Sequence, residues 1–169
     1  IDWYLPGFRA GGPIRSCANL VAHLSGEFDF LIVTRDTDYM SKSPYESIKK
    51  NAWNVNPDGS RIYYISKENL NPINIKRIIR ETEADYYYLN GIFSYLFTIT
   101  PLKYISARKR IIIASRGMLA PSAIAIKSFK KKVFFFYAKL TGLFNGITFQ
   151  ASSEEEKKQI DHIFPGSTV

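Results

Sequence analysis

A glycine-rich loop at residues 6–13 has the composition of a phosphate-binding turn. It places two adjacent glycines, Gly11 and Gly12, directly before a predicted helix. Glycine lets backbone amides come close to a phosphate, and the N-terminus of a helix favours an anion. The loop has neither the G-x-G-x-x-G spacing of dinucleotide-binding folds nor the lysine motif of a P-loop. We therefore expect a phosphate near these amides, with a simple tight turn as the alternative.

Two further loops carry polar side chains that suit a sugar or a phosphate. Asn90 and Gly91 follow one apolar run, and Arg116 and Gly117 follow another. A guanidinium group can clamp a phosphate with two hydrogen bonds, and no carboxylate lies near Arg116 in sequence. A plain turn at Asn90 and a structural salt bridge at Arg116 are the alternatives.

A fourth segment combines hydroxyl groups with three acids. Ser152 and Ser153 precede Glu154, Glu155 and Glu156, which is the pattern of a capped helix with negative charge at its positive end. Capping accounts for most of this pattern.

Metal chemistry and nucleophilic catalysis have little support. His23 and His162 lie within predicted helices, and Cys17 lies on the apolar face of the same helix as His23. We expect no metal site and no cofactor. A single cysteine excludes an internal disulfide and fits a reducing compartment, so the cytoplasm is the expected location.

These loops need a scaffold that brings them to one edge, and the chain alternates strand-like with helical patterns. The predicted strands are residues 1–5, 28–34, 52–55, 61–65, 86–89, 110–114 and 147–151. The predicted helices are residues 13–26, 72–84, 93–107 with a kink at Pro101, 122–145 and 153–164. This order predicts an α/β fold with a doubly wound, mostly parallel sheet, helices on both faces and a single Rossmann-like domain over residues 1–169. Ligands of such sheets bind beyond the carboxyl ends of the strands.

Charge is unevenly distributed along the 169 residues, whose formal net charge is +8. No Asp or Glu lies between Tyr86 and Ser153, a stretch that holds ten Lys and Arg residues. The rest of the chain has 13 basic and 15 acidic residues and is nearly neutral. We expect an anionic partner, because ordinary surfaces mix both signs. A solvated, lysine-rich surface is the alternative.

The predicted helix at residues 122–145 has apolar residues on two sides. Its expected core stripe is Ile126, Phe129, Val133, Phe136, Leu140, Leu143 and Phe144. The opposite side combines lysines with aromatic rings: Lys127, Lys130, Lys131, Phe134 and Phe135. Lysines beside exposed rings are typical of helices that bind an anionic membrane surface. A docking face for another domain and a solvated face are the alternatives, and no apolar stretch is long enough to span a bilayer.

Taken together, the loops resemble the N-terminal domain of bacterial glycosyltransferase family 4, of the retaining GT-B type. The resemblance rests on four segments in the same order: Trp3-Tyr4-Leu5-Pro6-Gly7-Phe8 with Gly11-Gly12-Pro13-Ile14-Arg15, Tyr88-Leu89-Asn90-Gly91-Ile92-Phe93, Ser115-Arg116-Gly117-Met118-Leu119, and Ala151-Ser152 with Glu154 to Glu156. It covers essentially the whole chain. Many members have His where Asn90 and Gln150 stand.

The resemblance implies the acceptor-binding half of a two-domain hexosyltransferase, with a C-terminal nucleotide-sugar domain that is absent from this sequence. Gly11, Gly12 and Arg15 would face the donor phosphates, and Asn90, Arg116 and Gly117 would bind the acceptor. The partners would be a nucleotide-diphosphate sugar and a lipid-linked or polysaccharide acceptor in cell-surface glycan synthesis, at the inner face of the membrane. No metal would be required. The family's paired glutamates belong to the other domain, so no catalytic residue is assigned and this part alone should be inactive.

Two other functions are open. One is a basic module that binds nucleic acid or an anionic membrane without catalysis; the predicted strands are apolar on both faces, which disfavours an exposed nucleic-acid platform. The other is half of a dinucleotide-dependent oxidoreductase, which the missing glycine spacing disfavours. Because the chain starts and stops within apolar segments, we expect the native protein to be longer at both ends.

Overall fold

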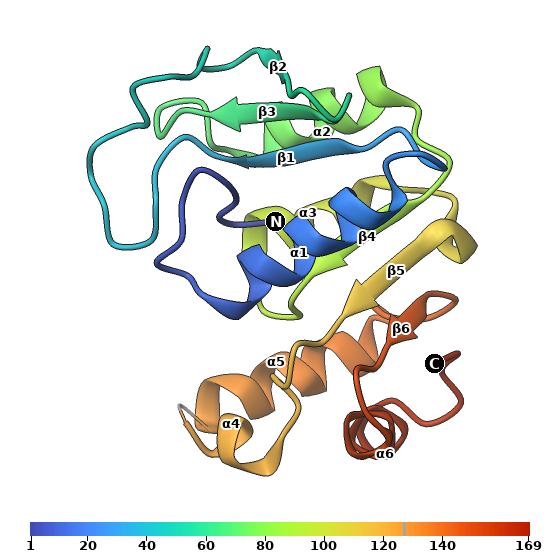
Figure 1. Ribbon diagram of the computed structural model, residues 1–169. Coiled ribbons are helices and arrows are strands. Elements are labelled where there is room, and N and C mark those ends of the chain that lie inside the picture. The colour runs from blue at the N-terminus through green and yellow to red at the C-terminus, as the bar shows by residue number, and fades with distance from the viewer. Residues whose placement is uncertain (127) are drawn as a thin grey trace. The chain divides into compact units, whose positions relative to one another are not determined.

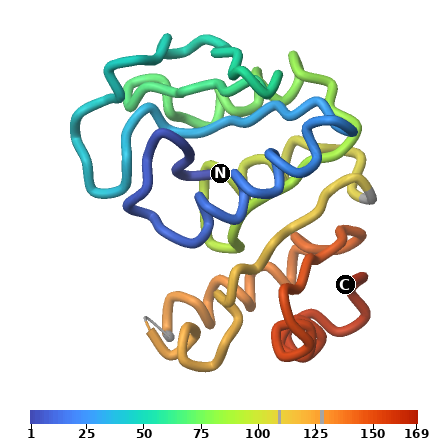
Figure 2. Tube along the Cα trace, viewed as in Figure 1, coloured from blue at the N-terminus to red at the C-terminus, as the bar shows by residue number. Residues whose placement is uncertain are grey.

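The computed structural model describes residues 1–126 and 128–169, with every side chain in them except those of Lys109 and Ser128. The backbone forms two units, Ile1–Thr82 and Glu83–Val169 (Figure 1; Figure 2). Each unit combines a three-stranded sheet with helices, so the predicted α/β class is confirmed. A single domain over residues 1–169 stays a prediction.

The first unit is built on three strands in the order β1-β3-β2. β1 (Leu31–Arg35) runs parallel to β3 (Arg61–Ile65), and β2 (Trp53–Val55) pairs with β3 in the antiparallel sense. β2 and β3 are joined by a turn in which the Gly59 N–H donates to the Asn56 carbonyl at 3.0 Å.

The predicted strand at residues 1–5 is wrong. The segment lies along β1 only at its start: the Ile1 amino group donates to the Val33 carbonyl at 3.1 Å, and the Arg35 N–H to the Asp2 carbonyl at 3.4 Å. A turn begins at Tyr4, whose carbonyl accepts from the Gly7 N–H at 3.0 Å. This turn takes the chain away from β1 before a ladder of hydrogen bonds can form.

Two helices of the first unit bury one apolar stripe each. α1 (Gly12–Leu24) buries Ile14, Cys17 and Val21, which are spaced three and four residues apart. α2 (Pro72–Thr82) buries Ile75 and Ile78. Both helices have proline in their first turn. A backbone N–H at this position has no partner within the helix, so proline, which lacks one, costs no hydrogen bond there.

The second unit has an all-parallel sheet in the order β4-β5-β6. The strands are β4 (Tyr87–Asn90), β5 (Ile111–Ala114) and β6 (Thr148–Gln150). Asn90 pairs with Ala114, and Ala114 pairs with Gln150, so all three strands end at the same level of the sheet.

The connections in the second unit are shorter than the sequence predicts. A π-helical turn (Tyr95–Ile99) precedes α3 (Thr100–Tyr104), and a 3-10 turn (Arg108–Arg110) leads into β5. The predicted helix at residues 122–145 is wrong as one element. It is replaced by α4 (Pro121–Ala125) and α5 (Ser128–Leu140), because Ile126 leaves the helical region with φ −69° and ψ 120°. α6 (Glu154–Ile163) follows β6.

None of the helices in the described ranges has both the length and the apolar character needed to cross a bilayer.

Candidate functional site

Polar side chains from three neighbouring strand ends meet in the second unit. The Arg116 Nε donates to the Asn90 side-chain oxygen at 3.1 Å, and an Arg116 Nη donates to the Tyr88 hydroxyl at 3.0 Å. The Tyr88 hydroxyl in turn donates to the side-chain oxygen of Gln150. We call Tyr88, Asn90, Arg116 and Gln150 the strand-end cluster. It links three places: strand β4, the loop that follows β5, and the end of β6.

The partners of Arg116 in this cluster are uncharged. The hydrogen bonds to Asn90 and Tyr88 therefore orient the guanidinium without cancelling its charge. Its central carbon also lies 6.0 Å from the centre of the Tyr88 ring, at the limit of a cation–π contact. A guanidinium held in a fixed plane suits a phosphate or carboxylate as its partner.

The backbone of this edge takes left-handed conformations. Arg116 has φ +54°, Gly117 has φ +70° and Gly91 has φ +81°. A Cβ on Gly91 would lie 2.8 Å from the Met118 Cε, so a larger residue there would also require the end of the Met118 side chain to move. A left-handed non-glycine residue costs about 1 kcal/mol or more and persists only where its surroundings fix it, as at many functional sites.

Glu156 provides that fixation from the first turn of α6. One carboxylate oxygen accepts from the Gly117 N–H at 2.7 Å and from the Ser115 hydroxyl. The other accepts from the N–H and the hydroxyl of Ser152 at 2.8 and 2.7 Å. The loops after β5 and β6 are thereby tied to one buried carboxylate.

These bonds also set the charge state of Glu156. Burial alone would raise the pKa of its carboxyl, but the hydrogen bonds from Gly117, Ser115 and Ser152 outweigh burial and lower the pKa to about 2. Ser153 caps α6 as predicted, since its hydroxyl accepts from the Glu156 N–H at 3.2 Å. The Glu156 side chain does not complete a capping box, because it is used by the neighbouring loops.

The glycine-rich loop of the first unit is held by a second carboxylate, that of Asp38. It accepts from the Phe8 N–H at 3.0 Å, from the Arg9 N–H at 3.2 and 3.3 Å, and from the Tyr39 N–H at 2.7 Å. Burial opposes ionisation, but these backbone N–H bonds lower the pKa of Asp38. The Tyr64 hydroxyl adds a bond to the Leu5 carbonyl at 2.8 Å.

The predicted phosphate-facing residues lie at the end of this loop. The Gly11 N–H donates to the Phe8 carbonyl at 3.0 Å and is therefore used within the turn. Gly12 and Arg15 are exposed in the first turn of α1. Within the described residues no hydrogen bond uses the Gly12 N–H. Gly12 thus offers an amide to a ligand, and the common rim of this loop with Arg116 stays a prediction.

The membrane-facing residues predicted on α5 need correction. Phe134 and Phe135 are packed inward: Phe134 lies 5.3 Å from Phe93 and 6.2 Å from Phe144, ring centre to ring centre. Phe135 contacts Phe93 and Phe164 at 5.7 and 6.0 Å. Both rings therefore pack against aromatic residues of their own unit and are only partly exposed.

The lysine predictions have mixed outcomes. The Lys131 ammonium donates to the Ala123 carbonyl and lies 5.0 Å from the centre of the Phe93 ring, so this residue is partly buried rather than at the surface. Lys130 is exposed as predicted. Lys127 lies outside the described residues.

The expected core stripe of this helix is wrong for the same reason. Phe129, Phe136 and Leu140 are 78%, 71% and 75% exposed, whereas Leu143 and Phe144 beyond the helix are buried as predicted. Residues 133–137 are apolar without a break, so spacing alone allows either side to pack. The aromatic rings of other segments decide which side does.

Comparison of the chain with protein-family models, with curated proteins and with solved structures finds no match.

Sequence reasoning missed the residues that hold the site together. Tyr88 lies inside a predicted strand, and Asp38 lies in a polar loop, so neither stood out. Glu156 was assigned to helix capping. The available signal was its position: three residues after a capping serine, and directly beyond a strand end, where other loops of a parallel sheet arrive.

The packing of Gly7 predicts a specific sensitivity of the first unit. A Cβ there would collide with the Tyr45 hydroxyl and lie 2.8 Å from the Asp38 Oδ1. Gly7→Ala is expected to lower the free energy of unfolding by about 1–3 kcal/mol, as overpacking does. Urea unfolding followed by tryptophan fluorescence measures this, since both tryptophans belong to this unit. Gly12→Ala is the matched control, because a Cβ there meets nothing within 4 Å. Equal effects of the two changes would contradict the assignment.

The low pKa of Glu156 predicts an acid-sensitive second unit. A pKa depressed from 4.5 to about 2 stabilises the fold above pH 4.5, and the stabilisation is lost as the pH falls towards 2. Glu156→Gln should remove about 3 kcal/mol at pH 7 and flatten this pH dependence. Hydrogen exchange of peptides from residues 83–169, measured at pH 7, 4.5 and 3, tests both effects. Glu155→Gln is the control, and the same loss in that variant would refute the role given to Glu156.

Proposed function

We propose that this chain is the acceptor-binding half of a glycosyltransferase of the GT-B type, which transfers a sugar from a nucleotide diphosphate to a glycan or lipid-linked acceptor. The strand-end cluster carries the proposal, because it fixes a charged guanidinium at the edge of a parallel sheet where such enzymes bind substrate. The likeness of its sequence segments to family 4 supports the same assignment. A doubly wound, Rossmann-like sheet uniting both units is part of this proposal.

In the proposed reaction the bond between the sugar and its diphosphate breaks, and a new bond forms to an acceptor hydroxyl, whose proton leaves. Arg116 would hold an anionic or hydroxyl group of the acceptor, with Asn90 and Gly117 beside it. Gly12, Arg15 and the positive end of α1 would stabilise the negative charge that develops on the departing diphosphate. Gly11 would serve by allowing the left-handed turn, with φ +69°. The chain supplies positioning and electrostatics, and no catalytic residue is assigned to it.

The Arg116 assignment is tested on the full-length protein. Tritiated UDP- and GDP-sugars are supplied with a lipid and polysaccharide extract of the source cells, and transferred label is counted. Arg116→Ala should lower kcat/KM by about ten- to a hundredfold, the value of one charge-assisted hydrogen-bonding group. Arg110→Ala, an exposed arginine of the same unit, should have little effect. Absence of transfer from every donor would refute the reaction, and full activity of Arg116→Ala would refute the site.

We further propose that α5 attaches the protein to an anionic membrane, through a different face from the one that spacing suggested. Four exposed apolar residues form the α5 stripe: Phe129, Val133, Phe136 and Leu140. At 100° per residue they span one narrow arc of the helix. Lys130 lies on one flank of this arc, and Lys132 and Lys139 lie on the other, all exposed.

The charge around the α5 stripe favours anionic lipid over another protein domain as its partner. Neither α5 nor the whole stretch between Tyr86 and Ser153 contains an acid. Each lysine near an anionic leaflet adds about 1 kcal/mol, while the rings enter the headgroup boundary. A membrane location fits a lipid-linked acceptor.

Vesicle sedimentation tests the α5 stripe. Phe129→Ser/Phe136→Ser should reduce binding to vesicles of phosphatidylglycerol and phosphatidylcholine by about tenfold or more, because two rings no longer leave water. The control Ile73→Ser/Tyr86→Ser removes two equally exposed apolar side chains elsewhere and should bind normally. Equal binding to pure phosphatidylcholine, or unchanged binding of the double serine variant, would contradict the proposal.

A further inference from the structure

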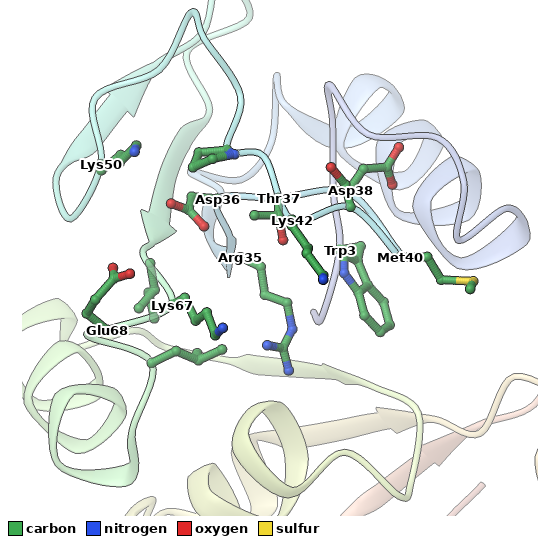
Figure 3. Close-up of a pocket in the computed structure, with 14 residues that line it drawn as sticks. Trp3, Arg35, Asp36, Thr37, Asp38, Met40, Lys42, Lys50, Lys67 and Glu68 are labelled. Carbon is green, nitrogen blue, oxygen red and sulfur yellow. The ribbon is translucent and has the colours of Figure 1, made fainter.

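A cavity of about 360 Å³ lies at the carboxyl edge of the sheet in the first unit (Figure 3). β1 and β3 are parallel, so the residues after Arg35 and Ile65 arrive at the same edge. The Asp36 N–H donates to the Ile65 carbonyl at 3.1 Å and joins the two loops there. Asp36 and Ile65 are 3% and 1% exposed and lie deepest among the lining residues. This edge is where α/β sheets bind their ligands.

One side of the cavity is cationic. Arg35 and Lys42 lie on the side that Trp3 borders, and Lys67 lies between Arg35 and Glu68 (Figure 3). Arg35 is held in place by an ion pair with Asp2 at 3.4 Å and lies 5.5 Å from the centre of the Trp3 ring. Lys42 and Lys67 are exposed, and neither forms an ion pair within the described part of the chain. Two lysine charges are therefore left for a ligand.

The other side carries carboxylates. Asp36 and Glu68 lie there with Lys50 (Figure 3). Burial raises the pKa of Asp36; the charge of Lys50 opposes this rise and that of Glu68 adds to it. The third carboxylate of the lining, Asp38, is already used by the amides of the glycine-rich loop. Asp36 is thus the deep acceptor that a ligand would meet.

These features fit a molecule with three kinds of group. Ammonium groups bind phosphate or carboxylate, a buried carboxylate accepts from hydroxyls, and an indole supplies an apolar wall for a ring. A simple anion would use the lysines but be repelled by Asp36, whereas a neutral sugar would leave the lysines unused. We propose that this cavity binds a sugar that carries an anionic group, with the anion at Lys42 and Lys67, the ring beside Trp3 and hydroxyls donating to Asp36.

This site goes beyond the proposed transfer reaction and does not depend on it. It is built entirely from residues 3–70, whereas the strand-end cluster belongs to the second unit. Loss of binding here and loss of transfer through Arg116 can therefore be observed separately.

Fluorescence titration of the 169-residue chain tests the proposal in a Trp53→Phe background, in which Trp3 is the remaining tryptophan. The probes are glucose 6-phosphate, glucuronate, glucose and inorganic phosphate. At least one of the two anionic sugars should bind about tenfold more tightly than both glucose and inorganic phosphate. The stronger of the two identifies phosphate or carboxylate as the natural anion. Equal binding of glucose, equal binding of inorganic phosphate, or no response to either anionic sugar would overturn the proposal.

Variants assign the binding to the cavity. Lys42→Glu/Lys67→Glu should lower the affinity for the anionic sugar by about tenfold or more. Lys49→Glu/Arg80→Glu, which changes the net charge equally on exposed positions outside the lining, should not. Asp36→Asn should lower the affinity for the anionic sugar without lowering the affinity for inorganic phosphate, a pattern that general unfolding would not produce. Unchanged affinity in the lysine variant, or an equal loss in its control, would overturn the assignment.

Discussion

The second unit depends on the buried carboxylate of Glu156. Its two oxygens receive four hydrogen bonds from Ser115, Gly117 and Ser152. Without them, the loops after β5 and β6 would leave several backbone and hydroxyl groups unpaired, and Arg116 would lose the support for its left-handed backbone. Because the carboxylate and not a ligand satisfies these donors, the edge is formed before anything binds. Such preorganisation keeps the cost of ordering out of the binding step.

Asp38 plays the corresponding part in the first unit. It accepts hydrogen bonds from the backbone N–H groups of Phe8, Arg9 and Tyr39. The space beside it leaves no room for a Cβ at Gly7. Both carboxylates have their pKa lowered by hydrogen bonds that outweigh burial. In each unit, a carboxylate is thus paired with backbone N–H groups, and cationic side chains lie at the sheet edge: Arg116 in the second unit, and Lys42 and Lys67 in the first.

The sequence predicts what depends on local pattern. The strand at residues 61–65, the start of α2 at Pro72 and the Ser153 cap are set by residues close in the chain, and all three are found. The predictions that fail depend on distant partners. The extended run at residues 1–5 forms no ladder because its turn starts at Tyr4, and α5 packs its other side because Phe93, Phe144 and Phe164 arrive from elsewhere. Of the site, loop position predicts Asn90 and Arg116 as neighbours, but Tyr88 and Glu156 need the register of the sheet.

The two apolar sides of α5 follow from one constraint. The side with Phe134 and Phe135 packs against aromatic rings of its own unit, and the α5 stripe on the other side is left exposed. A solvated helix gains nothing from four exposed apolar side chains, and exposed patches of this kind mark surfaces that bind something. The flanking lysines limit the choice further, because an apolar protein interface excludes uncompensated charge from its core, whereas a lipid headgroup layer accepts both the rings and the ammonium groups. The same exposed stripe that spacing misassigned to the core is therefore the feature on which the proposed membrane attachment rests.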